Sequence, residues 1–98
     1  MEAAGESQGR ILVVDDEPST LELARDILAP EGHAVVTASS GTEAVDCLRG
    51  SPFDLVVTDL VMPGMGGIDL LRQVEESWPE VPVIILTGNA DIATAVAA

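Results

Sequence analysis

Short apolar runs separated by polar segments predict the strands of a sheet. Three of them are unbroken, at residues 11–14 (Ile-Leu-Val-Val), 55–57 (Leu-Val-Val) and 83–86 (Val-Ile-Ile-Leu). Strands that are apolar on both faces belong in the middle of a parallel sheet covered by helices. A more mixed run at 34–37 (Ala-Val-Val-Thr) is typical of an edge strand.

The segments between these runs have helical periodicity. A helix is expected over 18–29, because Pro18 suits the first helical position and Leu21, Ala24 and Leu28 share one face. Others are expected over 40–50, where Ser40 and Glu43 form a capping-box pattern, over 67–78, and from 89 to 98. Alternating strands and helices predict an α/β fold, a doubly wound parallel sheet with right-handed crossovers.

Length and composition indicate one small domain without a membrane span. The 98 residues leave room for a single core, so residues 1–9 are expected to be a flexible leader and 10–98 the domain. The apolar runs are too short to cross a bilayer, so a cytoplasmic location and no membrane partner are expected. A formal charge of −13 argues against direct nucleic-acid binding by this segment. Cys47 is the single cysteine, which excludes a disulfide framework.

Acidic residues follow two of the predicted strands. Asp15, Asp16 and Glu17 come after the first, Asp59 ends the third, and Thr87 follows the fourth. The carboxyl ends of parallel strands meet at one edge of the sheet, where ligands of such folds bind. An Asp-Asp-Glu turn alone would more often be a solvated helix cap, but a carboxylate from a second central strand favours a site for Mg²⁺ or Mn²⁺, which prefer oxygen ligands.

A carboxylate beside such a cation can hold the metal or attack a phosphoryl group. Phosphoryl transfer needs mainly positioning and neutralisation of charge. Thr87 could bind a phosphoryl oxygen, although a hydroxyl at the end of a strand more often caps the next helix. The loop 62–67 (Met-Pro-Gly-Met-Gly-Gly) permits close backbone approach but matches no phosphate-loop pattern.

Three segments in register resemble the bacterial two-component response-regulator receiver domain. They are 11–18 (Ile-Leu-Val-Val-Asp-Asp-Glu-Pro), 59–71 (Asp-Leu-Val-Met-Pro-Gly-Met-Gly-Gly-Ile-Asp-Leu-Leu) and 82–88 (Pro-Val-Ile-Ile-Leu-Thr-Gly). The resemblance runs from about Arg10 to the end of the chain. It implies a flavodoxin-like receiver fold with strand order 2-1-3-4, in which the family's fifth strand is missing.

The resemblance also implies roles for individual residues. Asp59 would accept a phosphoryl group from a phosphohistidine of a sensor histidine kinase. Mg²⁺ would be bound by Asp15, Asp16, Asp59 and the backbone carbonyl of Val61. Thr87 would be the switch hydroxyl that draws in the loop after the fourth strand. Family members phosphorylate and dephosphorylate themselves, and they act as switches and not as enzymes on a free substrate.

The chain departs from the family in two respects. The family carries a fifth strand and helix, and a lysine that pairs with the phosphoryl group, whereas this chain has no lysine. We therefore expect the domain to be incomplete at its C-terminus, with 83–86 as an exposed apolar edge that promotes dimerisation, domain swapping or aggregation. An output domain could follow, and residues 87–98 are similar to receivers of transcriptional activators.

Three other functions fit the sequence less well. A pseudo-receiver would use the same fold as an unphosphorylated interaction or dimerisation module, and the complete set of Asp15, Asp16, Asp59 and Thr87 argues against it. An aspartyl-phosphate hydrolase would need an aspartate at the position of Val61. A nucleotide-binding domain would need a phosphate loop.

Overall fold

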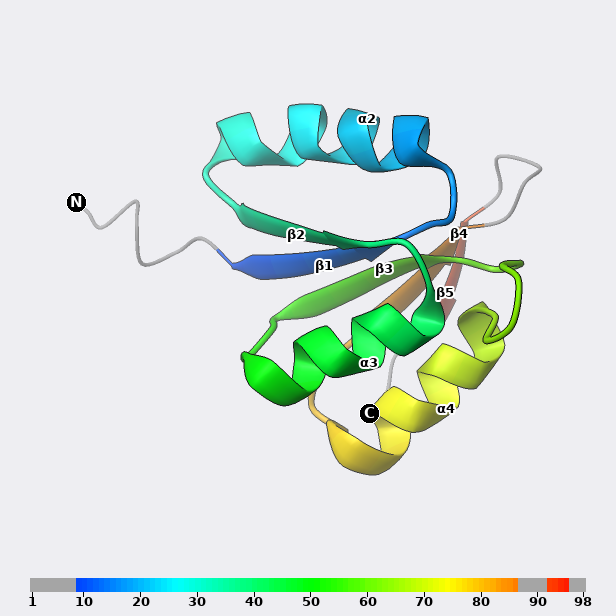
Figure 1. Ribbon diagram of the computed structural model, residues 1–98. Coiled ribbons are helices and arrows are strands. Elements are labelled where there is room, and N and C mark those ends of the chain that lie inside the picture. Colours follow the sequence, from blue (N-terminus) through cyan, green and yellow to red (C-terminus); the bar gives the residue numbers. More distant parts are fainter. Residues whose placement is uncertain (1–8, 87–91, 96–98) are drawn as a thin grey trace.

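The computed structural model describes residues 9–86 and 92–95, and from β1 to β4 strands and helices alternate as the sequence predicts (Figure 1). The elements are β1 (Arg10–Val14), α2 (Pro18–Leu28), the 3₁₀ turn η1 (Ala29–Glu31), β2 (Ala34–Ala38), α3 (Gly41–Gly50), β3 (Leu55–Asp59), α4 (Gly67–Ser77), β4 (Val83–Leu86) and β5 (Ile92–Ala95). Residues 1–8 of the expected leader lie outside the described residues.

The sheet has the order β2-β1-β3-β4-β5, and its first four strands are parallel. This confirms the predicted doubly wound order 2-1-3-4 and places the mixed strand β2 at an edge. In the register, Val14 lies beside Thr58, and Asp59 lies beside Leu86. The carboxyl ends of β1, β3 and β4 therefore meet at one edge of the sheet.

Helices cover both faces of the sheet, but the main core lies on one of them. In Figure 1, α2 lies on one face, over β1 and β2, while α3 and α4 lie side by side on the other. The core beneath α3 and α4 includes Leu12, Val56, Leu70, Val74 and Val83, all of which are fully buried. On the opposite face every residue of α2 is half-buried or exposed, and Leu23 and Ile27 are 59% and 58% exposed.

The first turn of α3 is capped as its sequence suggests, with one difference. The Ser40 hydroxyl accepts a hydrogen bond from the Glu43 N–H at 3.1 Å, as in a capping box. The Glu43 carboxylate, however, accepts from the N–H and hydroxyl of Ser39, at 2.6 and 2.8 Å, and not from the Ser40 N–H. These bonds lower the pKa of Glu43.

The segment after β4 contradicts two expectations. The sequence pattern predicts a helix over 89–98, but Ile92–Ala95 forms strand β5. β5 pairs antiparallel with β4, with Val83 beside Ala95 and Leu86 beside Ile92, so β4 is not the exposed edge of the sheet. The physical reason is that the unpaired N–H and C=O groups of a β4 edge are satisfied by the next stretch of chain, and this outweighs the helical propensity of its alanines.

In the part of the chain that the structure describes, no helix combines the length and apolar character that a bilayer crossing requires.

Candidate functional site

Asp15 and Asp16 directly follow β1 and lie in different environments. The side chain of Asp15 is buried (8% exposed), whereas Asp16 is exposed. The Asp15 N–H donates to the Ala38 carbonyl at 3.1 Å, which extends the pairing of β1 with β2 by one residue. An Asp15 carboxylate oxygen accepts from the Glu17 N–H at 2.9 Å, which fixes the turn into α2.

Asp59 is the last residue of β3 and is half-buried. One oxygen of its carboxylate accepts from the Leu60 N–H at 2.9 Å, and the same N–H lies 3.0 Å from the Leu86 carbonyl of β4. The other carboxylate oxygen has no hydrogen bond to the described residues. Asp59 is thus held by local backbone while one oxygen remains available for chemistry.

The three aspartates converge as the strand order predicts. Asp15, Asp16 and Asp59 each offer a carboxylate oxygen, and these atoms all lie within 4.8 Å of one another. Burial and the nearby charges of Asp59 and Asp16 raise the pKa of Asp15, and the hydrogen bond from Glu17 only partly offsets this effect. Among the described residues, no arginine forms a salt bridge with this cluster.

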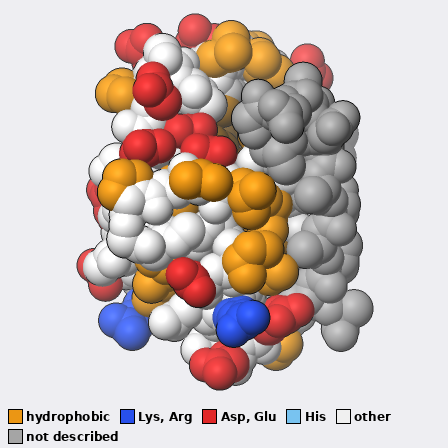
Figure 2. Space-filling view, turned by 90° about the vertical axis from the view of Figure 1, so that its right-hand side faces the viewer, with side chains coloured by type: hydrophobic (Ala, Val, Ile, Leu, Met, Phe, Trp, Pro, Cys, Tyr) orange, Lys and Arg blue, Asp and Glu red, His pale blue; other side chains and the backbone are white. Residues whose placement is uncertain are grey.

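This donor set fits a hard divalent cation. Oxygen ligands without histidine or thiolate suit Mg²⁺ or Mn²⁺ better than zinc. Two unit charges ~5 Å apart repel by roughly 3 kcal/mol at an effective dielectric of ~20, so a cation that joins three carboxylates would relieve a substantial penalty. Figure 2 shows acidic side chains gathered beside an apolar surface in the view onto this end of the sheet.

Val61 and Thr87 are the two other predicted site residues. Val61 lies two residues beyond β3, at the start of the loop into α4, and its side chain is 75% exposed. A side chain facing solvent is compatible with a role for its backbone carbonyl alone. Thr87 follows Leu86 in the chain and lies outside the described residues.

Gly67 is a structural residue of the site that the sequence did not single out. It is the first residue of α4 and is buried against β3. A Cβ atom at this position would lie 2.5 Å from the Asp59 carbonyl oxygen, and the Gly67 N–H donates to the Leu60 carbonyl at 2.9 Å. Glycine here lets α4 start directly against the backbone of Asp59, which fixes the position of that residue. The signal in the sequence is the Gly-Gly pair at 66–67, which by itself indicates only a loop with close backbone approach.

The chain matches the family model of the response regulator receiver domain over residues 11–98. It is 44% identical to the transcriptional regulatory protein GlrR of Escherichia coli (strain K12) over 88 residues, which are 90% of this chain and 20% of GlrR. It is 42% identical over 96 residues to the alginate biosynthesis transcriptional regulatory protein AlgB of Pseudomonas syringae pv. tomato, covering 98% of this chain and 21% of AlgB. The chain thus spans about a fifth of the length of these relatives.

A solved structure agrees with the sequence comparisons. The response regulator protein TrrA of Thermotoga maritima, in complex with Mg²⁺-BeF, is 38% identical with a TM-score of 0.76, covering 80% of this chain and 68% of TrrA. Sequence, strand order and the clustered aspartates point to the same assignment. The chain belongs to the response regulator receiver domain family of two-component systems.

Proposed function

We propose that this receiver domain is a phosphorylation switch in which Asp59 accepts the phosphoryl group. The observation that carries the proposal is the convergence of Asp15, Asp16 and Asp59 within 4.8 Å at the carboxyl ends of β1 and β3. The donor would be a phosphohistidine of a sensor histidine kinase. An Asp59 oxygen would attack the phosphorus, the bond from phosphorus to the histidine nitrogen would break, and an aspartyl phosphate would form.

Asp15, Asp16, Asp59 and the Val61 carbonyl are the proposed ligands of Mg²⁺. When bound, the ion would supply positive charge that offsets the charges of the carboxylates and of the incoming phosphoryl oxygens. The TrrA complex with Mg²⁺-BeF supports this ligand class for the fold. Glu17 holds Asp15 in place, and the Leu60 N–H orients Asp59 so that one oxygen stays available. Thr87 is the proposed switch hydroxyl.

The wider setting is also a proposal. GlrR and AlgB are by name transcriptional regulatory proteins and are much longer than this chain. We propose that the domain acts in the cytoplasm as the input module of such a regulator, with an output domain C-terminal to it. The comparisons give no support to the pseudo-receiver alternative.

Intact-mass measurement after incubation with phosphoramidate and Mg²⁺ tests the proposal. A gain of one phosphoryl group is expected, and Asp59→Asn should abolish it. Asp69→Asn is the matched control, because Asp69 is an exposed aspartate in the first turn of α4 outside the cluster, and it should leave the gain unchanged. A wild-type chain that binds Mg²⁺ but gains no mass would contradict the proposal.

A further inference from the structure

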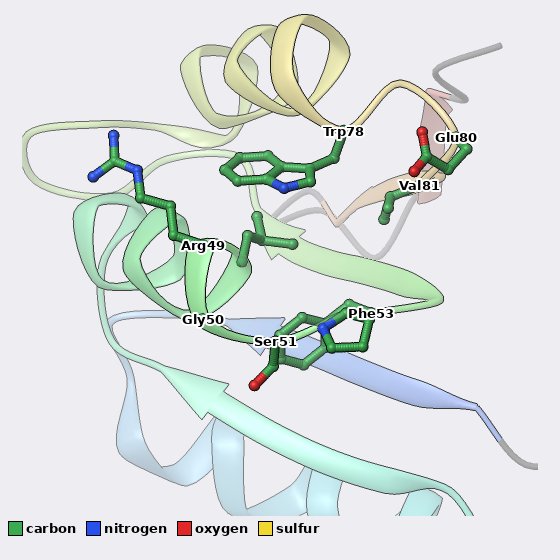
Figure 3. Close-up of a pocket in the computed structure, with 9 residues that line it drawn as sticks. Arg49, Gly50, Ser51, Phe53, Trp78, Glu80 and Val81 are labelled. Carbon is green, nitrogen blue, oxygen red and sulfur yellow. The ribbon is translucent and has the colours of Figure 1, made fainter.

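A cavity of about 370 Å³ lies at the end of the molecule away from the aspartate cluster. It is formed where α3 and α4 end, by the last turn of α3, the loop before β3 and the segment from Trp78 to Val81 (Figure 3). Leu48, Phe53 and Val81 provide a buried apolar floor. Volumes from ~300 Å³ upward are typical of small-molecule sites.

Hydrogen bonds hold the wall that carries Phe53. The Arg10 Nε donates to the Pro52 carbonyl at 2.9 Å, and its guanidinium carbon lies 5.0 Å from the centre of the Phe53 ring. The backbones of Arg10 and Asp54 also bond to each other, at 2.8 Å. The loop is therefore tied to β1, and the cavity does not depend on a freely moving segment.

The facing wall is equally fixed. The backbone N–H of Trp78 donates to the Val74 carbonyl at 2.7 Å, and the backbone N–H of Val81 donates to the Trp78 carbonyl at 3.0 Å. The indole of Trp78 is half-buried and packs against the core. The half-buried indole thus lines the cavity between two anchored walls.

The electrostatics of the cavity favour a cation. Helices α3 and α4 both end here, at Gly50 and Ser77, and helix C-termini carry partial negative charge. The Glu80 carboxylate lines the cavity, and indole is the side chain that binds cations best through its ring face. The net charge of −13 adds long-range attraction.

Arg49 is the one lining group that opposes a cation. Its guanidinium lies 3.7 Å from the Asp46 carboxylate, and both side chains are 69% exposed, so its field is partly paired and screened by solvent. In Figure 3, Arg49 and Glu80 lie on opposite sides of Trp78. A cation can therefore sit over the indole on the Glu80 side, with an apolar stem toward Leu48 and Phe53.

We propose that this cavity binds an organic cation, an alkylguanidinium or alkylammonium group, between Trp78 and Glu80. The group could belong to a free small molecule or to an arginine or lysine side chain of a partner. The proposal does not depend on phosphorylation of Asp59.

Trp78 is the only tryptophan of the chain, so its fluorescence reports on the cavity directly. The experiment titrates the full chain with n-butylguanidinium at constant ionic strength, with pentanamide as the neutral match. We expect saturable quenching by the cation alone. A blocked Gly-Arg-Gly peptide in a parallel titration distinguishes the two sources: tighter binding of the peptide assigns the site to a partner side chain, and tighter binding of n-butylguanidinium assigns it to a free molecule.

Two substitutions, one that removes a negative charge and one that removes a positive charge, test where the cation lies. Glu80→Gln should weaken binding about threefold to fivefold, and Arg49→Gln should strengthen it by about twofold. Asp26→Asn, an exposed site on α2, makes the same change in net charge as Glu80→Gln and should have little effect. Absence of saturable quenching by n-butylguanidinium, an equal effect of Asp26→Asn and Glu80→Gln, or equally tight binding of pentanamide would each overturn the proposal.

Discussion

At the scale of single residues, Asp15 combines burial of its carboxylate with the nearby charges of two other aspartates, and both disfavour its ionised form. Its carboxylate is 8% exposed and lies in a cluster with two other carboxylates. The raised pKa of Asp15 means that the folded state binds its proton more readily than the unfolded state does. The ionised group therefore destabilises the fold above this pKa, and the penalty is relieved as pH falls through it or when a cation binds.

Replacement of Asp15 by asparagine should accordingly stabilise the protein without metal. Asparagine keeps an oxygen that can accept from Glu17 but removes the charge, so we expect a gain of about 1 kcal/mol at pH 7, or ~4–8 °C in Tm. Mg²⁺ should raise the Tm of the wild type and much less that of Asp15→Asn. Thermal unfolding in EDTA and in Mg²⁺ measures both effects, with Asp69→Asn as control. A variant less stable than the wild type in EDTA would show that the contacts of the Asp15 carboxylate outweigh its repulsion from the other two.

The convergence of Asp15, Asp16 and Asp59 could be predicted because strand ends and carboxylates are both visible in the sequence. The sequence could not show how α4 packs against Asp59, since the role of Gly67 depends on a backbone approach between distant segments. The apolar face of α4 was also only partly predicted. Helical spacing places Ile68 and Leu71 on the apolar face of this helix, but Ile68 is 45% exposed, whereas Leu70 and Val74 are fully buried. Helical periodicity locates the buried face of a short helix only to within about one residue.

At the scale of elements, the start of α3 depends on the ionised form of Glu43. Its carboxylate accepts both bonds from Ser39, and these bonds lower its pKa below the usual 4.5. A lowered carboxyl pKa contributes stability above the unfolded value, and this stability is lost as pH falls through the folded value.

Glu43→Gln should therefore destabilise the protein by a few tenths of a kcal/mol, up to about 1 kcal/mol, at pH 7, since the site is exposed and screened. The difference from the wild type should shrink as the pH is lowered below 4.5. Urea unfolding at pH 7 and pH 3.5 measures this, and Glu22→Gln on α2 is an exposed control. A difference that stays constant across this range would mean that the charge of Glu43 is not involved.

The order of the four parallel strands and the three helices before β4 could be predicted from hydrophobic periodicity and from the proline and glycine residues at the ends of the elements. The secondary structure of residues 92–95 could not be predicted in this way. The alanine-rich sequence favours a helix locally, while the edge of β4 offers backbone hydrogen-bond partners. Pairing across the sheet decides between the two, and single-sequence patterns do not contain that information.

At the scale of the whole molecule, the face that carries α2 has apolar surface in contact with solvent. Leu23 and Ile27 are both more than half exposed, and Leu55, Val57 and Ile84 of the sheet are half-buried. The expected exposed edge at β4 is wrong as a reason for self-association, but this surface provides another one.

We expect the chain to self-associate as its concentration rises. A charge of −13 on each copy opposes association, so dimers should increase when salt screens that charge. Sedimentation velocity at 0.05 and 0.5 M NaCl measures this effect. Leu23→Glu with Ile27→Glu should shift the population toward monomer, whereas Glu22→Gln should not. A wild-type monomer at high protein concentration and high salt would contradict the prediction.

The topology of the sheet also determines when the aspartate cluster can exist. Asp15 and Asp59 come together only when β1 pairs with β3, and helices α2 and α3, the 3₁₀ turn η1 and strand β2 lie between these two strands in the chain. Pairing of such distant strands is a non-local event with a large loop-closure cost, so we expect the site to be assembled late on the folding pathway. A ligand that recognises the finished cluster would then slow unfolding much more than it accelerates folding. For this domain, ligand binding would act mainly by prolonging the lifetime of the folded chain.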